Sequence, residues 1–185
     1  MPRLIIYGDF NCPFSALASV RADALQTAGG GYEIDWRAVQ HDTAIPSDGE
    51  SVTGDTAAEL ATEVATIGEL SADDDVRLEL VVPPVRSNTA AASAGLAAAG
   101  GSADVLRRRL FAAVWAEGRN VGDPTELDRL GITRRDDDIA TRWQDEFEGL
   151  ERPVTPSMVL PDGYVSRGLG ALARLAELIE ATKAG

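Results

Sequence analysis

The strongest constraint on the fold is the change of hydrophobic period along the first part of the chain. Residues 3–8 form a short apolar run of the kind that fills a buried strand. Residues 13–28 carry apolar side chains at helical spacing, and this pattern stops at the three glycines of residues 29–31. Residues 32–38 then alternate between apolar and charged side chains. The opening therefore predicts a β-α-β unit whose helix can cross over between parallel strands.

The end of the chain returns to strands. Residues 157–160 and 164–167 flank the turn Pro161-Asp162-Gly163 and predict a β-hairpin. Leucine, alanine and isoleucine over residues 172–179 follow the period of an amphipathic helix. The last part of the chain therefore predicts a β-β-α unit.

Residues 41–149 separate these two units and carry mainly helical patterns. After a polar loop, apolar side chains recur at helical spacing in several stretches, which begin at Thr56, Asn88, Asp104, Asp123 and Asp136. We expect one α/β domain over residues 1–185, with a core made by residues 1–40 and 150–185. In this interpretation residues 41–149 are a large all-helical insertion.

The charge balance excludes several classes of partner. The chain has 30 Asp and Glu against 17 Lys and Arg, a net charge of −13. Such a surface repels phosphate backbones and anionic lipids, so we expect no nucleic-acid partner and no membrane surface. No apolar run approaches the ~20 residues that span a bilayer, and the N-terminal run is too short for a signal peptide. These features predict a cytoplasmic protein.

The kinds of charged residue suggest the salt in which the protein works. Every basic residue except Lys183 is an arginine, and acidic residues cluster at 73–75 and 136–138. Excess carboxylate keeps a protein hydrated where salt screens its self-repulsion. This pattern favours a halophilic protein, and an acidic protein from a GC-rich genome is the alternative. Neither cluster has the ligand spacing of a calcium loop, so we expect no metal site.

The only cysteine, Cys12, lies where the first strand ends and the first helix begins. Pro13 suits the first helical position, because the N–H that proline lacks would be unpaired there. The sulfur should then face free backbone N–H groups at the positive end of the helix dipole, which lowers a thiol pKa below about 8.5. The alternative is an inert buried cysteine.

Ser15 follows Cys12 at the distance of one helical turn. Its hydroxyl can donate a hydrogen bond to a thiolate, but it cannot resolve a mixed disulfide as a second cysteine would. An external thiol must then release any mixed disulfide formed at Cys12. The Cys-Pro-Phe-Ser sequence therefore favours monothiol exchange or isomerisation over net dithiol oxidation.

Thr155-Pro156 is the second candidate element, directly before the apolar strand at 157–160. A cis peptide at this proline would hold the chain in a tight bend, and a trans proline at the first position of a strand is the alternative. In the expected fold this bend faces the start of the first helix. It would offer backbone groups to an extended substrate.

These segments together resemble the thioredoxin fold as elaborated in the DsbA family, and more closely its FrnE-like and 2-hydroxychromene-2-carboxylate isomerase-like branch. The resemblance rests on residues 9–15, on Asn88-Thr89 at the start of a helix, on residues 110–124 and on Thr155-Pro156. It covers nearly the whole chain. It implies a thiol–disulfide oxidoreductase or disulfide isomerase, with a protein disulfide or a small-molecule thiol as its substrate.

The resemblance also implies roles for three residues: Cys12 matches the nucleophile, Pro156 matches the family's cis-proline, and Thr155 matches the residue before it, whose backbone pairs with substrate. From its position we expect Ser15 to activate the thiolate, and we expect Pro13 and Phe14 to contact substrate together with Thr155 and Pro156. No cofactor is implied apart from a low-molecular-weight thiol as co-substrate, and homodimer formation is left open. Two features depart from the family: Ser15 replaces the resolving cysteine, and residues 36–41 lack the usual Pro-Phe.

Two other functions remain open. Small-thiol-dependent isomerases and kappa-class glutathione transferases resemble the same layout, although these relatives carry Ser at the position of Cys12; this function predicts a deep pocket between the insertion and Pro156. A non-catalytic binding module predicts an ordinary thiol pKa. The single histidine, His41, follows the second strand and is interpreted as a surface or capping residue. Asp9 is interpreted as a loop or capping residue, with tuning of the thiol as the alternative.

Overall fold

The computed structural model describes residues 1–75 and 77–184. The first elements are β1 (Arg3–Gly8), α1 (Pro13–Thr27) and β2 (Glu33–Ala38), which confirm the predicted β-α-β opening. The chain ends in β5 (Ser157–Val159), β6 (Val165–Arg167) and α7 (Leu169–Ala184), the predicted β-β-α unit. Between them lie, in chain order, β3 (Glu50–Ser51), α2 (Gly54–Leu70), β4 (Val85–Arg86), α3 (Ala90–Ala97), the 3₁₀ turn η1 (Gly100–Ser102), α4 (Ala103–Trp115), α5 (Pro124–Arg129) and α6 (Asp137–Glu148).

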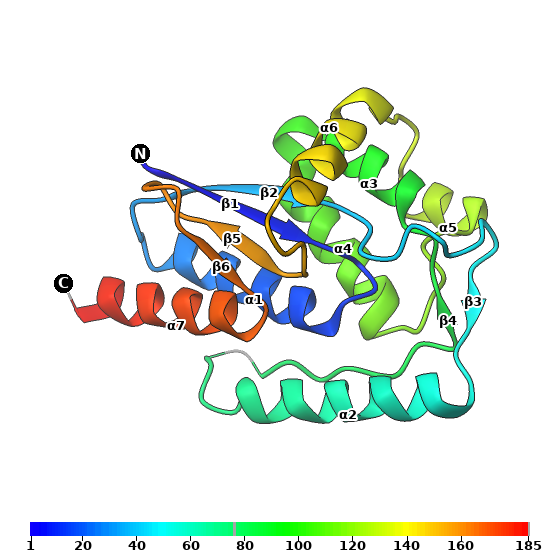
Figure 1. The fold of residues 1–185 in the computed structure, drawn as a ribbon, viewed down its shortest axis with the longest axis horizontal. Helices are drawn as coiled ribbons and strands as arrows, with labels where there is room; N and C mark the ends of the chain where they lie inside the picture. The colour runs from blue at the N-terminus through cyan, green and yellow to red at the C-terminus, as the bar shows by residue number, and fades with distance from the viewer. Residues whose placement is uncertain (76, 185) are drawn as a thin grey trace.

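The central sheet has four strands in the order β2-β1-β5-β6 (Figure 1). β1 runs parallel to β2, and β5 runs antiparallel to both β1 and β6. Tyr7 near the end of β1 lies opposite Ser157 at the start of β5. The antiparallel pairing therefore brings the chain that leaves β1 and the chain that enters β5 to the same edge of the sheet.

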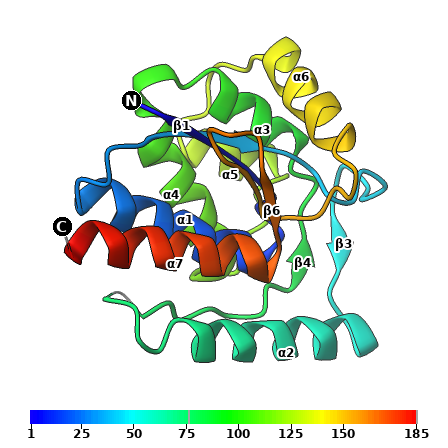
Figure 2. The same ribbon diagram turned by 60° about the vertical axis from the view of Figure 1, so that its left-hand side comes forward.

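The two faces of β1 are covered by different helices, as alternating side chains require. Leu4 and Ile6 are fully buried in the main core, which also contains side chains of α1 and α7. Tyr7 points to the other face and packs on Phe147 of α6. Figures 1 and 2 both show α1 and α7 side by side beneath the sheet.

The helix α2 is only lightly embedded in the molecule. Only Leu60 and Ile67 of α2 are buried, and the rest of the helix is half-buried or exposed. Figures 1 and 2 show α2 at the lower edge of the molecule, with the following chain running back alongside it. It is therefore an arm that leaves the core and returns to it.

The insertion is not all helical, which corrects the prediction. Glu50 pairs with Arg86 and Ser51 with Val85 in an antiparallel ribbon, and the Val52 N–H extends it by donating to the Pro84 carbonyl at 2.9 Å. Two-residue strands are too short to show a period of two, and a proline precedes one of them, so no strand pattern was visible at these positions. The ribbon ties together the two ends of the α2 arm.

Candidate active site

Cys12 is the N-cap residue of α1, as the sequence predicted. Its backbone is extended, with φ −99° and ψ 116°, and Pro13 follows at the first helical position. The Cys12 carbonyl accepts hydrogen bonds from the N–H groups of Ser15 and Ala16, at 3.0 and 3.2 Å. The sulfur is thus held at the start of the helix by the backbone of the first turn.

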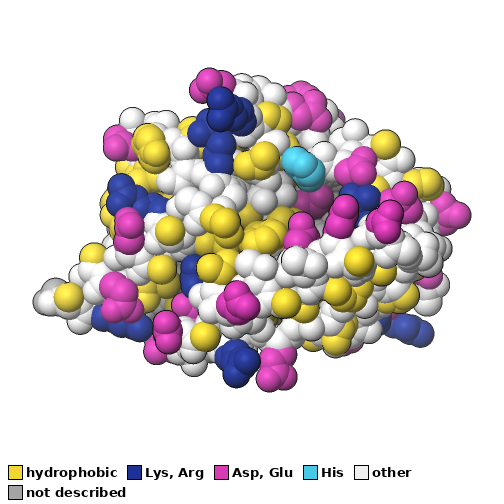
Figure 3. All heavy atoms as spheres, turned by 60° about the horizontal axis from the view of Figure 1, so that its bottom comes forward, with side chains coloured by type: hydrophobic (Ala, Val, Ile, Leu, Met, Phe, Trp, Pro, Cys, Tyr) yellow, Lys and Arg dark blue, Asp and Glu magenta, His cyan; other side chains and the backbone are white. Residues whose placement is uncertain are grey.

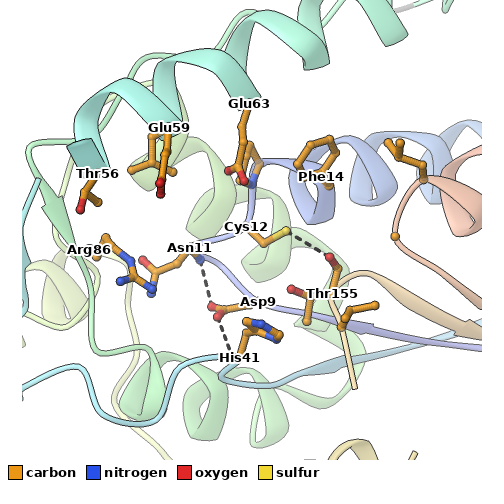
Figure 4. A pocket seen from close by; sticks show the side chains of 15 residues that line it. Asp9, Asn11, Cys12, Phe14, His41, Thr56, Glu59, Glu63, Arg86 and Thr155 are labelled. Carbon is orange, nitrogen blue, oxygen red and sulfur yellow. Dashed lines mark hydrogen bonds between the residues drawn. The ribbon is translucent and has the colours of Figure 1, made fainter. Parts of the chain in front are cut away.

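Thr155 lies directly across from the sulfur. Cys12 Sγ donates to the Thr155 carbonyl oxygen at 3.4 Å, and the Thr155–Pro156 peptide is cis (Figure 4). The bend expected before β5 is therefore present and adjoins the thiol. Residues 143 positions apart in the chain meet here, because β1 and β5 pair antiparallel.

A cavity of about 500 Å³ opens over the sulfur. The segment of residues 9–15, here called the cavity floor, forms its base through Asp9, Asn11, Cys12, Pro13 and Phe14, and residues 56–63 of α2, here called the α2 wall, form one side. Val154, Thr155, Gly168 and Leu169 line another part of the cavity. The sulfur is thus reached through a cleft between the insertion and the segment around the cis proline.

Four of the six predicted site residues line this cavity: Cys12, Pro13, Phe14 and Thr155. Pro156 is buried behind Thr155 and does not line the cavity. Ser15 is also fully buried. Its hydroxyl accepts a hydrogen bond from the Asp9 N–H at 3.3 Å, and this bond stabilises the cavity floor from its buried side.

Asp9 holds the cavity floor against two distant segments. Its side chain is 3% exposed and accepts hydrogen bonds from the N–H groups of Asn11 and His41, both at 2.9 Å, and from Thr89 Oγ1 at 3.4 Å. The hydrogen bond from its backbone N–H to Asp9 holds His41 beside the cavity, which it lines. Burial raises the pKa of the Asp9 carboxyl above its ordinary value, and these hydrogen bonds work in the opposite direction.

Asn11 is a positioning residue that the sequence analysis did not identify. Its Oδ1 accepts from the Ser87 N–H at 2.9 Å, and its Nδ2 donates to the Ser87 carbonyl at 2.6 Å. This pair joins the cavity floor to the chain that follows β4. A single polar residue before the cysteine gave no signal, because its partner lies 76 positions away.

The electrostatics of the thiol differ from the prediction. Burial raises the pKa of Cys12 and the Asp9 charge raises it further, whereas hydrogen bonds from the side chains of Ser15 and Thr155 and from the Ser15 backbone lower it. The expected net lowering by the helix N-terminus is therefore wrong for the free protein. The physical reason is desolvation, because a half-buried sulfur beside a carboxylate loses more from ionisation than local N–H groups return.

The α2 wall adds carboxylates to the cavity. Glu59 and Glu63 lie one helical turn apart and both line it. Burial raises the pKa of Glu63, and so does the neighbouring charge of Glu59, whereas the charge of Arg86 lowers it. Over the described ranges, no group of three or more His, Cys, Asp or Glu side chains is arranged to hold a metal ion. No helix in those ranges is both long and apolar enough to cross a membrane.

Comparison with known proteins relates this architecture to solved structures. A probable DsbA oxidoreductase from Streptomyces coelicolor aligns with a TM-score of 0.77 at 18% identity, over 98% of this chain and 90% of that one. A 2-hydroxychromene-2-carboxylate isomerase aligns with a TM-score of 0.62 at 23% identity, over 97% and 93%. Reduced DsbA1 from Neisseria meningitidis aligns with a TM-score of 0.52 at 13% identity, over 100% and 87%.

These alignments show that the fold is shared. They confirm the resemblance to the DsbA family that the sequence suggested. No curated protein matches the chain significantly. The family profile described as the DSBA-like thioredoxin domain matches residues 3–133, which include the cavity floor, the α2 wall and both strands of the ribbon. The chain therefore belongs to the DsbA-like thioredoxin domain family.

Proposed function

We propose that this protein is a monothiol thiol–disulfide oxidoreductase or disulfide isomerase that acts through Cys12. The observation that carries the proposal is the position of the sulfur. Cys12 is the N-cap residue of α1, and its sulfur donates a hydrogen bond to the Thr155 carbonyl at 3.4 Å and lies at the base of a cavity of about 500 Å³. A substrate sulfur that enters the cavity can approach Cys12 while its backbone lies along Thr155 as an added strand.

The exchange has two balanced steps. The Cys12 thiol first loses its proton to solvent, and the thiolate attacks one sulfur of the substrate disulfide. A Cys12–substrate disulfide forms, and the other sulfur leaves as a thiolate with the electron pair of the broken bond. An external thiolate, or a second thiolate of the same substrate, then attacks the substrate sulfur and releases Cys12 as a thiolate.

Ser15 gives the proposed reaction its monothiol character. It occupies the position of a resolving cysteine but accepts a hydrogen bond from the Asp9 N–H. The mixed disulfide therefore persists until another thiol arrives. Because the pKa of Cys12 is raised, the first step should accelerate as the pH rises through that pKa.

The test is capture of the mixed disulfide. Wild-type protein mixed with 2-hydroxyethyl disulfide should accumulate one adduct at Cys12, seen by intact-mass spectrometry, and glutathione should remove it. In Ser15→Cys the introduced thiol should resolve the adduct without added thiol. Absence of an adduct in wild type at alkaline pH would overturn the proposal and favour a binding module on the same fold.

A small-thiol-dependent isomerase or transferase is the second candidate, and the cavity between α2 and Thr155 favours it. This function requires a low-molecular-weight thiol to bind reversibly without forming a disulfide. Titration calorimetry of glutathione with Cys12→Ser distinguishes the two. Micromolar binding to this variant would favour the transferase, and exchange chemistry predicts none.

We also propose that the protein works in a cytoplasm of high salt. The net charge of −13 and the near absence of lysine support this, because self-repulsion of carboxylates weakens as salt shortens the screening length. The melting temperature should rise between low and molar KCl. A flat or falling melting curve would remove the proposal.

A further inference from the structure

The α2 wall presents two carboxylates that the chain itself does not neutralise. Figure 4 shows Glu59 and Glu63 pointing from α2 into the cavity that Cys12 lines. Within residues 1–75 and 77–184 neither side chain forms an ion pair or a hydrogen bond. Residues four apart on a helix are neighbours, so two like charges are held close together.

The basic group of the cavity is already engaged. Arg86 donates to Glu50 at 2.9 Å and to Asp42 at 3.2 Å, so its charge is shared with carboxylates outside the cavity. The other titratable groups that line the cavity are Asp9, His41 and Cys12 itself. Wherever the carboxyls are ionised, the cavity therefore attracts cations and repels anions.

Another part of the cavity lining is apolar. Val154 is 37% exposed and Leu169 is 58% exposed, and both line the cavity together with the half-buried ring of Phe14. Figure 3 shows hydrophobic side chains gathered on one side of the histidine and acidic side chains on the other. The sulfur thus lies between an apolar surface and an acidic one.

Given the proposed thiol–disulfide exchange, on which this inference rests, we propose that Glu59 and Glu63 are specificity-determining residues. They select disulfides that carry an ammonium or guanidinium group close to the attacked sulfur. The apolar part of such a substrate lies on Phe14, Val154 and Leu169. The substrate class is thus a cysteine beside a lysine or arginine in a polypeptide, or a small amine-bearing disulfide with the same chemistry.

The same charge complementarity assists the chemistry. A cation held against Glu59 and Glu63 brings positive charge into the cavity of Cys12 and offsets the effect of Asp9 on the thiol. An anionic disulfide has the opposite influence, because its negative charge adds to that of Asp9 and disfavours the Cys12 thiolate further. The preference should therefore be expressed in the rate of attack.

The experiment measures second-order rate constants for mixed-disulfide formation with three small disulfides: cystamine, neutral 2-hydroxyethyl disulfide and anionic dithiodiglycolate. Two peptide disulfides that differ only by Arg or Glu beside the cysteine test the polypeptide source. Each rate is divided by that of the same probe with a small free thiol, which removes differences in the intrinsic reactivity of the disulfides. The wild-type protein should prefer cystamine to dithiodiglycolate at least roughly tenfold at low salt, because one close charge contact in water changes a rate about fivefold and the cation gains where the anion loses.

Three variants separate specificity from folding. The double substitution Glu59→Gln with Glu63→Gln should bring the cation-to-anion ratio to within about twofold, and molar salt should have a similar effect on wild type. Replacing both residues by lysine should invert the ratio. Glu69→Gln removes the same charge from an exposed position of α2 that does not line the cavity, and it should leave the ratio unchanged.

The outcomes distinguish this inference from the proposed function. Adducts that form at equal normalised rates with all three small disulfides would overturn the specificity and leave the exchange reaction standing. Absence of adducts with every probe would overturn the exchange reaction itself. A preference seen only with the peptides assigns the site to polypeptides, and one seen with cystamine as well extends it to small disulfides.

Discussion

The cavity floor and the α2 wall line the same cavity but are built in opposite ways. In the floor, Phe10 is fully buried against Phe111, and its carbonyl accepts from the indole N–H of the buried Trp115 at 2.8 Å. In the wall, Leu60 is buried, whereas Glu59 is exposed and Glu63 is half-buried. The floor is part of the core, and the wall is part of an arm.

This difference teaches where substitutions can be made. A nucleophile must be held by side chains that are themselves packed, so changes to the floor should affect both the fold and the proposed reaction. A wall of solvated side chains can change its charge at little cost in stability. The five predictions that follow measure this contrast, from the largest expected effect to the smallest.

Replacing the sulfur alone should remove the chemistry completely. In Cys12→Ser we expect no mixed disulfide with any probe, since a serine hydroxyl does not exchange with disulfides. Stability should be unchanged or raised by up to about 1 kcal/mol, because serine is a good N-cap and Cys12 makes no side-chain cap hydrogen bond. Mass spectrometry and urea denaturation measure the two effects. An adduct at another site would place the nucleophile elsewhere.

Removing the buried ring of the floor should lower the stability most. Phe10→Ala leaves a cavity beside Phe111, whose ring centroid is 5.0 Å away, and should reduce the free energy of unfolding by about 3–5 kcal/mol. Leu169→Ala on the exposed side is the matched truncation and should change it by less than about 0.5 kcal/mol. Equal losses in the two variants would contradict the contrast between a packed floor and solvated surroundings.

Neutralising Asp9 should shift the titration of the thiol. Because the Asp9 charge raises the pKa of Cys12, Asp9→Asn should move the inflection of the iodoacetamide alkylation rate to lower pH. In wild type this inflection should lie above the ordinary cysteine value of about 8.5. Asp48→Asn, on an exposed loop, removes the same charge and should leave the inflection in place.

The same variant tests the pH dependence of stability. The pKa of Asp9 is raised in the folded protein, so its contribution is fully present below the unfolded value of about 3.9 and is lost as the pH rises through the folded pKa. Between acid and neutral pH, wild type should therefore lose stability relative to Asp9→Asn. Urea denaturation across that range checks the sign, and a relative gain by wild type would contradict it.

The smallest effect should come from the wall. Glu59→Gln removes a solvated carboxylate that makes no ion pair, so the free energy of unfolding should change by less than about 0.5 kcal/mol. Urea denaturation measured alongside Phe10→Ala gives the comparison directly. A loss of several kcal/mol would show that the wall is part of the core.

Local patterns in the sequence predicted the skeleton of the molecule. The period changes over residues 3–38 predicted β1, α1 and β2, and Pro13 after Cys12 predicted the sulfur at the helix start. The bend at Thr155-Pro156 was predicted because proline restricts the chain locally. Each of these features depends on a few adjacent residues, which is why they could be read without coordinates.

Contacts between distant residues could not be read in this way. The sequence did not reveal that Asn11 pairs with Ser87, that Asp9 anchors His41 and Thr89, or that a ribbon joins the ends of the α2 arm. These partners lie 32 to 80 positions apart, and many residues at those separations have equivalent chemistry. Which of these residues meet is decided by the pairing of the strands and by the path of the α2 arm.

The thiol illustrates the division most clearly. The sequence by itself determined that Cys12 caps a helix, since a cap is set by its immediate neighbours. The tertiary structure decided the direction of its pKa, because desolvation and the charge of Asp9 depend on everything packed around the sulfur. It also decided which helix adjoins the sulfur, and so placed Glu59 and Glu63 in the lining of the cavity that Cys12 also lines.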